Sequence, residues 1–275
     1  MRGTLFVVAT PLGNLADLSP RGAETLRRVS VVAAEDTRHT RPLLTHIGSS
    51  ADLISVHAHS APQALERVLE LLAVGKDVAL VTDAGTPAIS DPGAALVAAA
   101  RARDFQVVTI PGPTAVAAAL AVSGLSADRY LFLGFLPRKG GERRRLLERI
   151  AQSEWTVVLF ESPNRTAELL DDLAAACGPE RRAAVARELT KLFEETRDGT
   201  LADLAGYYRD APPRGEVTVI IAGTGASERE PELPDPESRA RELLAQGMSR
   251  RDVANQLADE TGITRNTAYR LVNEL

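Results

Sequence analysis

The sequence has one cysteine, few aromatic residues and no long apolar run. Among its 275 residues, aromatic side chains make up 4%, and Cys177 is the only thiol. A single thiol excludes an internal disulfide and a thiolate-rich metal site, and its place at the end of an apolar helical pattern favours an unreactive, half-buried group. The apolar run from Leu5 to Ala9 is too short for a signal-peptide core or a membrane span. We therefore expect a cytoplasmic protein.

Several motifs of common enzyme classes are also missing. The sequence has no G-x-G-x-x-G dinucleotide motif, no G-x-x-x-x-G-K-[ST] phosphate loop and no nucleophile elbow with a Ser/His/Asp set. Of its four histidines, His57 and His59 lie closest in sequence, but neither has a carboxylate or thiolate nearby to complete a zinc site. We therefore expect no metal and disfavour hydrolase and dehydrogenase chemistry. The net charge of −5 disfavours a surface that coats nucleic acid as a whole, although local basic patches remain compatible with it.

The composition favours α/β layers. Apolar residues make up 44% of the chain, and alanine, leucine and valine dominate them. Strand-like and helical runs alternate through the first half, which predicts a mainly parallel sheet with helices on both faces. We expect strands at residues 4–9, 29–34, 53–56, 78–82 and 106–110, and helices at 20–28, 37–46, 62–74, 92–103 and 114–122.

The second half predicts a less regular block. We expect strands at 130–133, 156–160, 183–186 and 216–222, with helices at 142–152, 165–176 and 201–208, and a mixed sheet. The polar, proline-rich stretch 226–236 is typical of a linker. The predicted organisation is an N-terminal α/β domain at 1–112, a second α/β domain at 113–225, the linker, and a helical module at 237–275.

The final module resembles a helix-turn-helix pattern. Ser249 and Asp252 have the spacing of a capping box, and Thr264 can cap the last helix. Ala258, Gly262 and Ile263 have the spacing of the helix-turn-helix corner. A three-helix packing module without a nucleic-acid role fits the same pattern equally well.

Short polar loops follow most of the predicted strands, and the stretch from Val78 to Gly93 is the most informative of them. An apolar strand there runs into Asp83 and Gly85 and then into a loop with two prolines. Ligands of open parallel sheets bind just beyond the carboxyl ends of the strands, so these loops predict a shared crevice. The loops are T-P-L-G-N-L at 10–15, E-D-T-R at 35–38, the loop at 83–93, P-G-P-T-A at 111–115, F-E-S-P-N-R at 160–165 and R-E-L-T-K at 187–191.

A basic patch precedes the helix predicted at 142–152. Cations in the first turn of a helix interact unfavourably with the helix dipole unless a bound anion compensates them. An RNA phosphate is a suitable anion at this position. A solvated charged helix is the alternative. The candidate RNA-binding residues are Arg138, Lys139, Arg143, Arg144 and Arg145, together with Arg38 and Arg165 from the strand-end loops.

Taken together, these motifs, with G-F-L-P-R-K at 134–139, resemble the tetrapyrrole (corrin/porphyrin) methylase superfamily and, within it, the ribosomal RNA small subunit methyltransferase I group. The resemblance covers residues 3–223 in order. It implies two α/β domains with the methyl donor S-adenosylmethionine in the cleft between them, a homodimer, and methylation of the ribose 2′-hydroxyl of a cytidine in the decoding region of 16S rRNA. Thr114 stands where the family usually has serine, and Asn164 where it commonly has histidine.

The resemblance also assigns residues to the donor site. Glycine and alanine there let the backbone approach the ligand, carboxylates can bind hydroxyl or ammonium groups, and Ile89 supplies an apolar wall. The implied cofactor-binding residues are Pro11, Asp83, Ala84, Gly85, Ile89, Thr114, Ala115, Phe160, Glu161 and Leu189.

A ribose hydroxyl is a weak nucleophile, so we expect a general base or a nearby cation to assist it. The candidates are Glu35, Asp36, Glu188 and Lys191. Each of them also fits a structural ion pair at a domain seam, and the sequence does not choose between the two roles.

Two other functions remain open at this stage. One is a methylase of a tetrapyrrole or of a protein residue, which would need neither the basic loop nor the helical module. The other is a ligand-sensing regulator that binds duplex DNA through the helix-turn-helix. The modest positive charge of the last helix, which ends in Glu274, disfavours the second alternative.

Overall fold

The computed structural model describes residues 2–275 except 57–61, 92, 227–234 and 262. The chain forms two compact units, Met1–Thr224 and Gly225–Leu275, and each is described by itself. The first unit holds two five-stranded sheets. The further boundary predicted at residue 112 stays a prediction. It falls between the last strand of one sheet and the first strand of the other.

The first sheet is wholly parallel, as the alternation of strands and helices predicts. Its strands lie in the order β3-β2-β4-β1-β5, so β4 is central and β2 and β1 flank it. Consecutive strands are therefore not always neighbours, and a crossover helix joins each to the next. The strands are β1 (Thr4–Val8), β2 (Val31–Ala34), β3 (Asp52–Ser55), β4 (Val78–Val81) and β5 (Gln106–Ile110).

Helices cover this sheet because β4 and its neighbours are apolar on both faces. Successive residues of β4 enter different core clusters: Leu80 packs with Leu69 and Leu96, and Val81 packs with Leu26 and Leu44. The first cluster is supplied by α3 and α4, and the second by α1 and α2. The helices are α1 (Pro20–Arg28), α2 (Thr37–His46), α3 (Pro62–Ala73) and α4 (Gly93–Ala102).

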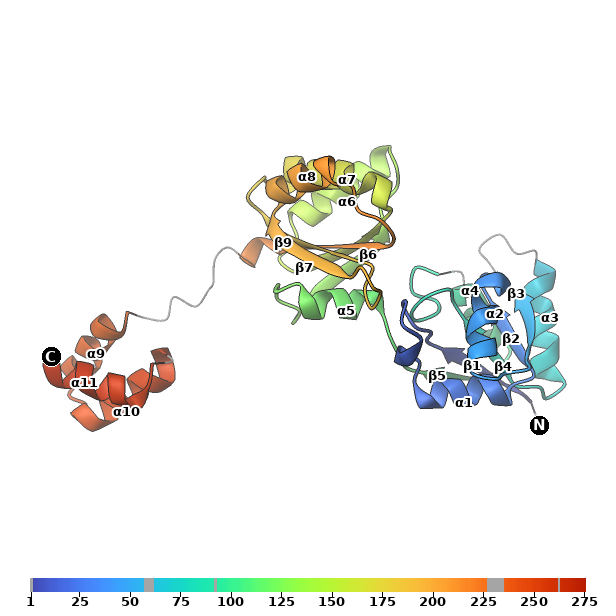
Figure 1. Cartoon of the computed structure of the whole chain (residues 1–275), viewed down its shortest axis with the longest axis horizontal. Helices are drawn as coiled ribbons and strands as arrows, with labels where there is room; N and C mark the ends of the chain where they lie inside the picture. The colour runs from blue at the N-terminus through green and yellow to red at the C-terminus, as the bar shows by residue number, and fades with distance from the viewer. Residues whose placement is uncertain (1, 57–61, 92, 227–234, 262) are drawn as a thin grey trace. The chain divides into compact units, whose positions relative to one another are not determined.

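The second sheet is mixed, as predicted. Its order is β6-β7-β10-β8-β9, with β6 and β7 parallel and the other pairs antiparallel. Helix α5 lies on one face and α6, α7 and α8 lie on the other (Figure 1). The elements are α5 (Ala115–Val122), β6 (Tyr130–Phe135), α6 (Gly141–Ala151), β7 (Thr156–Glu161), α7 (Thr166–Cys177), β8 (Arg182–Arg187), β9 (Glu195–Thr200), α8 (Leu201–Asp210) and β10 (Val217–Ile221).

Strand β9 is the one strand that the sequence analysis did not predict. Its sequence, E-T-R-D-G-T, has no apolar alternation, and it lies at the edge of the sheet beside β8. Charged residues on an edge strand discourage pairing with another chain. The same charges remove the period-two pattern from which a strand is inferred.

The described residues of the second unit form three α-helices, and both predicted caps are confirmed. Ser249 Oγ accepts a hydrogen bond from the Asp252 N–H, and Thr264 Oγ1 accepts one from the Thr267 N–H. Ala258 and Ile263 pack against the small core of this unit, whereas the predicted corner glycine, Gly262, lies outside the described residues. The helices are α9 (Pro236–Ala245), α10 (Arg250–Thr261) and α11 (Arg265–Glu274). Within the described ranges, no helix is both long enough and apolar enough to cross a membrane.

Candidate functional site

The loops at the carboxyl ends of the first sheet are bound to one another. Thr10, after β1, and Gly85, after β4, form an antiparallel bridge with N–H···O distances of 2.9 and 3.1 Å. The Thr10 hydroxyl also donates to the Thr82 carbonyl at 3.1 Å. The Thr86 hydroxyl donates to the Pro113 carbonyl at 3.0 Å, which adds the loop after β5. The prediction that these loops share one edge is confirmed.

Gly85 is the position that allows this close approach. Its φ is +85°, and a Cβ atom built there would lie 3.3 Å from Leu12 Cδ2. An L side chain would therefore be strained by its backbone conformation and would crowd the loop after β1. The glycine in the D-A-G motif is required by the meeting of these loops.

Glu35 lies at the same edge, after β2. Its Oε2 atom accepts a hydrogen bond from the Thr82 hydroxyl at 3.0 Å. Partial burial raises the pKa of the Glu35 carboxyl above its ordinary value, and the negative charges of Asp91 and Asp83 raise it further, although the Thr82 hydrogen bond opposes the shift. Among the described groups, no cation forms an ion pair with Glu35. It is therefore a carboxylate with a raised pKa, hydrogen bonds from the Thr82 hydroxyl and the Asp83 backbone, and no cationic partner among the described residues.

Asp36, the next residue, is in the opposite electrostatic situation. Its carboxylate binds the Arg38 guanidinium at 2.6 Å and caps α2 by accepting the Arg38 N–H at 2.8 Å. These hydrogen bonds lower the pKa of Asp36 well below its usual range. The Asp36 N–H donates in turn to Asp83 Oδ1 at 3.1 Å. Asp36 is thus committed to shaping the start of α2.

A pocket of about 310 Å³ opens beside these loops and receives residues from both sheets. This volume is at the lower end of the range of about 300–1,000 Å³ found for small-molecule sites. Its wall is mainly apolar and aromatic, with a few polar groups. The lining residues are Leu12, Ala84, Ala115, Phe135, Phe160, Glu161, Ser162, Pro163, Leu189, Gly215, Glu216, Val217 and Thr218.

Half of the residues predicted to bind a cofactor line this pocket, namely Ala84, Ala115, Phe160, Glu161 and Leu189. The other predicted residues are not part of the lining. Pro11, Asp83, Gly85 and Thr114 each stand next to a lining residue in the sequence, and Ile89 is 44% exposed. Thr114 occupies the N-cap position of α5 without a side-chain capping hydrogen bond.

Glu161 is the most unusual group in the pocket, because it is a carboxylate that is only 3% exposed. Its Oε1 atom accepts hydrogen bonds from the Ser162 N–H at 2.7 Å, from the Ser162 hydroxyl, and from the Arg165 guanidinium. Its Oε2 atom is buried and has no partner among the described residues. Buried carboxylate oxygens ordinarily have partners, so Oε2 marks a place where a ligand donor fits.

The loop after β8 closes the site from the second sheet. Lys191 Nζ binds Glu188 Oε1 at 3.0 Å and Glu216 Oε2 at 2.7 Å. Burial alone would raise the pKa of Glu188, but the hydrogen bonds from Lys191 and the Glu216 N–H lower it overall. Burial alone would lower the pKa of Lys191, but the same two carboxylates raise it overall. Both groups are therefore held in their charged forms.

This loop has a strained backbone fitted against its neighbours. Glu188 has a φ of +51° and Thr190 a φ of +67°, values that are uncommon for residues other than glycine. A Cβ atom on Gly215 would lie 1.8 Å from Glu188 Oε1, so glycine is needed beneath that carboxylate. The Thr190 hydroxyl accepts the Asn14 N–H at 3.2 Å. Strain of this kind is retained where the surroundings impose it, often at functional sites.

The predicted RNA-binding residues divide into exposed side chains and side chains that are bound to other residues of the chain. Arg138, Lys139, Arg144 and Arg145 are exposed in and after the loop before α6. Arg143 is instead buried, with its guanidinium 2.6 Å from Asp172 and 3.0 Å from the Pro137 carbonyl. It therefore anchors the basic loop to α7.

Arg165 and Arg38 are also engaged, in different degrees. Arg165 is bound to Glu161 and to the Ser162 hydroxyl and remains half-buried. Arg38 pairs with Asp36, yet its side chain is 90% exposed. Arg38 can therefore contact a further anion, whereas Arg165 serves the buried carboxylate.

Seven lining residues had not been predicted as site residues: Leu12, Phe135, Ser162, Pro163, Gly215, Val217 and Thr218. An eighth, Glu216, holds Lys191. The F-E-S-P motif already contained two of them, and Leu12 belongs to the first loop. Gly215 to Thr218 carried no motif in the sequence. They face the pocket because β10 pairs with β7 and brings Val217 opposite Glu161.

Metal and thiol chemistry gain no support within the described part of the chain. No group of three His, Cys, Asp or Glu side chains there is placed to hold a metal ion, and His57 and His59 lie outside the described residues. Cys177 is half-buried, and this burial raises the pKa of its thiol. A raised thiol pKa disfavours the reactive thiolate.

The family model of the Tetrapyrrole (Corrin/Porphyrin) Methylases matches residues 4–205. The ribosomal RNA small subunit methyltransferase I of Synechocystis sp. is 45% identical over 99% of this chain and 98% of its own length. The protein of the same name from Pseudomonas aeruginosa is 43% identical over 97% and 95%.

Solved structures show the same fold at lower identity. Cobalt precorrin-4 methyltransferase, a cobalamin biosynthetic enzyme, superposes with a TM-score of 0.64 at 19% identity, over 80% of this chain and 94% of its own. Uroporphyrin-III C-methyltransferase from Thermus thermophilus, complexed with S-adenosylhomocysteine, gives a TM-score of 0.59 at 17% identity, over 80% and 97%.

The raised pKa of Glu35 predicts a pH-dependent contribution to stability. Its folded-state pKa lies above the unfolded value of 4.5, so its contribution is fully present below that pH and is lost as pH rises through the folded pKa. Replacing it by glutamine removes this loss. We expect Glu35→Gln to gain stability relative to the parent protein between pH 4 and pH 7, as measured by denaturant midpoints.

Glu66→Gln is the matched control because its sign is opposite. The hydrogen bonds from Arg103 lower the pKa of Glu66, so its contribution is present above pH 4.5 and is lost in acid. Glu66→Gln should therefore lose stability relative to the parent as pH rises over the same range. Parallel curves for the two variants would contradict the assignment for Glu35.

Proposed function

Because the chain belongs to the tetrapyrrole methylase family, we propose that it is an S-adenosylmethionine-dependent methyltransferase of small-subunit ribosomal RNA, and that it methylates the ribose 2′-hydroxyl of a cytidine in the decoding region. Near full-length relatives with 43–45% identity carry the name of a small-subunit rRNA methyltransferase, which supports the RNA substrate. The cytidine, the 2′-oxygen and the decoding region are our finer proposal. The reaction then belongs in the cytoplasm, where small subunits are assembled.

The observation that carries the proposal is the pocket with its buried, half-satisfied carboxylate. S-adenosylmethionine has an ammonium group and two ribose hydroxyls, and Glu161 Oε2 lacks a donor. Ala84 and Ala115 leave room for a ligand, while Phe160 and Leu189 offer apolar contact to its adenosine part. The residues present therefore fit the donor. We further propose that Asp83, Gly85, Thr114 and Pro11, each next to a lining residue in the sequence, contact the donor together with Ile89.

When bound, S-adenosylmethionine supplies an electrophilic methyl group on a positively charged sulfur. The chain must then align the ribose oxygen with that carbon and receive the hydroxyl proton. In the transfer, an O–C bond forms, the C–S bond breaks with its electron pair left on sulfur, and the proton passes to a base. Alignment accounts for most of the acceleration expected for an already activated donor.

We assign the base to Glu35. Of the four candidates, Lys191 is held protonated, and Asp36 and Glu188 have pKa values lowered by their hydrogen-bond partners. Among the three carboxylates, only Glu35 combines a raised pKa with the absence of a cationic partner among the described residues. A carboxylate whose pKa lies nearer the working pH is the better proton acceptor.

Glu188 and Lys191 then act as positioning residues. The ion pairs of Lys191 with Glu188 and Glu216 fix the loop that carries Leu189 into the pocket. The Lys191 side chain also passes over Gly13, where a Cβ atom would lie 2.2 Å from Lys191 Cγ. This contact joins the loop after β8 to the loop after β1.

The basic loop before α6 is the proposed contact for RNA outside the pocket. Arg138, Lys139, Arg144 and Arg145 are exposed there, and Arg143 holds the loop through Asp172. Phosphate contacts of this kind weaken steeply with salt. We further propose a homodimer. The exposed Leu192 and Phe193, at 90% and 68%, offer apolar surface for such contacts.

Mapping of the modified position tests the proposed function directly. Small subunits from a strain that lacks the enzyme are incubated with the chain and methyl-labelled S-adenosylmethionine, and the rRNA is digested to nucleosides. We expect the label on the ribose of one cytidine. A 2′-O-methyl group also protects the adjacent linkage from alkali, so the labelled linkage should resist alkaline cleavage. Label on a base, or no label in rRNA, would contradict the proposal.

Glu35→Gln tests the assignment of the base. General-base catalysis contributes on the order of 10²–10⁴-fold, so we expect kcat to fall by about 10²-fold or more. The dissociation constant of S-adenosylhomocysteine should stay within about twofold, because Glu35 is not part of the pocket lining. Glu66→Gln, which makes the same chemical change on α3, should keep parental kcat. A Glu35→Gln enzyme with parental kcat would exclude Glu35 as the base.

A further inference from the structure

Helix α2 carries positive charge and no acidic residue. Its ten residues, T-R-H-T-R-P-L-L-T-H, include Arg38, Arg41 and two histidines, in a chain whose net charge is −5. Thr37 and Arg38, Arg41 and Pro42, and Thr45 and His46 repeat at intervals of four, so they share one face of the helix. We call these six residues the α2 stripe.

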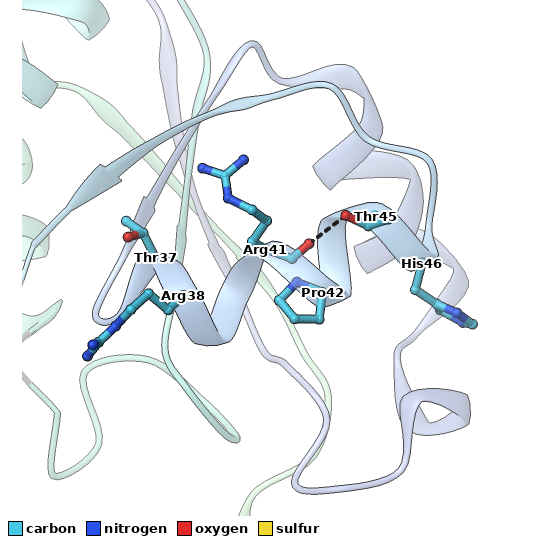
Figure 2. Close-up of a pocket in the computed structure, with 6 residues that line it drawn as sticks. All are labelled: Thr37, Arg38, Arg41, Pro42, Thr45 and His46. Carbon is cyan, nitrogen blue, oxygen red and sulfur yellow. Dashed lines mark hydrogen bonds between the residues drawn. The ribbon is translucent and has the colours of Figure 1, made fainter.

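The α2 stripe faces away from the core and forms an open depression. The opposite face of the helix buries Thr40, Leu43 and Leu44. Figure 2 shows the side chains of Arg38 and Arg41 leaving the helix in different directions, with His46 at the other end of the helix. The stripe residues are exposed except Thr37, which is half-buried.

The cations of the stripe differ in how far they are neutralised. Arg38 pairs with Asp36, while Arg41 has no ion-pair partner within the described part of the chain. A third guanidinium lies at the C-terminal end of the helix, where Arg27 Nε donates to the Ile47 carbonyl at 2.6 Å. A row of guanidinium groups in which only Arg38 has a carboxylate partner among the described residues is suited to a row of anions.

Pro42 gives the stripe acceptors as well as donors. A proline has no N–H, so it cannot donate to the carbonyl of Arg38 four residues earlier. The Thr45 hydroxyl donates to the Arg41 carbonyl at 3.0 Å, as Figure 2 shows. The stripe therefore combines guanidinium donors for phosphates with the Arg38 carbonyl, which can accept a hydrogen bond from a ribose hydroxyl.

We propose that the α2 stripe binds the sugar-phosphate backbone of the RNA substrate next to the methylated nucleotide. The inference rests on the proposed function, since Glu35 lies two residues before the start of α2. One helical turn rises about 5.4 Å, so Arg38 stands within one turn of Glu35, the proposed general base, and Arg41 stands about one turn further along the helix. The backbone that leaves the active site thus meets Arg38 first and Arg41 next.

RNA is favoured over an acidic protein segment by the match of spacing and charge. Phosphates recur regularly along a strand, and the stripe repeats its polar groups every helical turn. Contacts to phosphates hold register without reading sequence. The stripe would therefore orient the strand while the pocket and Glu35 act on one nucleotide.

Charge reversal at Arg41 tests the stripe. Binding of small subunits from the enzyme-deficient strain is measured for the parent protein, Arg41→Ala and Arg41→Glu over a range of salt concentrations. We expect Arg41→Glu to weaken binding at least about tenfold near 0.1 M salt. For Arg41→Ala, the slope of log K against log salt should decrease by about one, as for a lost phosphate contact.

Arg101→Glu is the matched control, because Arg101 is an exposed arginine of α4 without an ion-pair partner among the described residues. It makes the same charge change and should bind within about twofold of the parent. S-adenosylhomocysteine binding should be unchanged in all variants, which verifies that they fold. Equal RNA affinities of Arg41→Glu and Arg101→Glu would overturn the proposal.

The outcomes separate the stripe from the proposed function. If the parent protein methylates rRNA and Arg41→Glu does so with unchanged KM, the proposal that the α2 stripe binds RNA is wrong and the proposed function stands. If the parent binds small subunits through Arg41 but transfers no methyl group, the function is wrong and the stripe stands. A change in sedimentation of Arg41→Glu with unchanged RNA affinity would identify the stripe as a contact between copies and overturn the proposal.

Discussion

The two hydrogen bonds between Thr10 and Gly85 are the constraint on which the site depends. They join the loops after β1 and β4, which are neighbouring strands in the interior of the first sheet, and the Thr10 hydroxyl adds a third bond to Thr82. Because β4 ends at this junction, Ala84 is turned toward the pocket while Thr82 stays with Glu35. One junction therefore sets the positions of both the ligand wall and the proposed base.

Charge is distributed over the site in a way that separates structural from reactive groups. Asp36, Glu188 and Lys191 are each satisfied by neighbours, and their pKa values move so as to keep them charged. Glu35 and Glu161 are the exceptions, since Glu35 has no cationic partner among the described residues and Glu161 keeps a buried oxygen without a described donor. Leaving such groups incompletely satisfied costs stability, and active sites are where this cost is usually found.

Much of the fold follows from patterns in the sequence. Strand Gln106–Ile110 and helices Pro20–Arg28 and Thr37–His46 have the predicted bounds, because apolar periodicity and N-terminal Ser, Pro or Asp mark them clearly. Strand β9 was not predicted, because the charged residues of this edge strand remove the apolar alternation. The same reasoning explains the loops of the first sheet: their place after parallel strands predicted a common edge, and the structure confirms it for the loops after β1, β2, β4 and β5.

The candidate site was less predictable, because it depends on pairing between distant segments. Gly215 to Thr218 enter the pocket only through the register of β10 with β7, which no local pattern encodes. The commitment of Arg143 to Asp172 is equally hidden, since both residues look like ordinary surface charges in the sequence. Charge patterns identified which residues are ionic, and only the fold shows which of them are free.

The central claim is that one pocket, lined by residues of both sheets, holds the methyl donor. Calorimetric titration of S-adenosylhomocysteine into the parent protein and Ala84→Phe tests it most directly, because a phenyl ring at Ala84 would fill the pocket, whereas Ala117→Phe places the same ring on the exposed side of α5. The account predicts uptake by the parent and by Ala117→Phe, and an affinity lower by at least about tenfold for Ala84→Phe. Equal affinities in all three proteins, or no uptake by the parent, would contradict it.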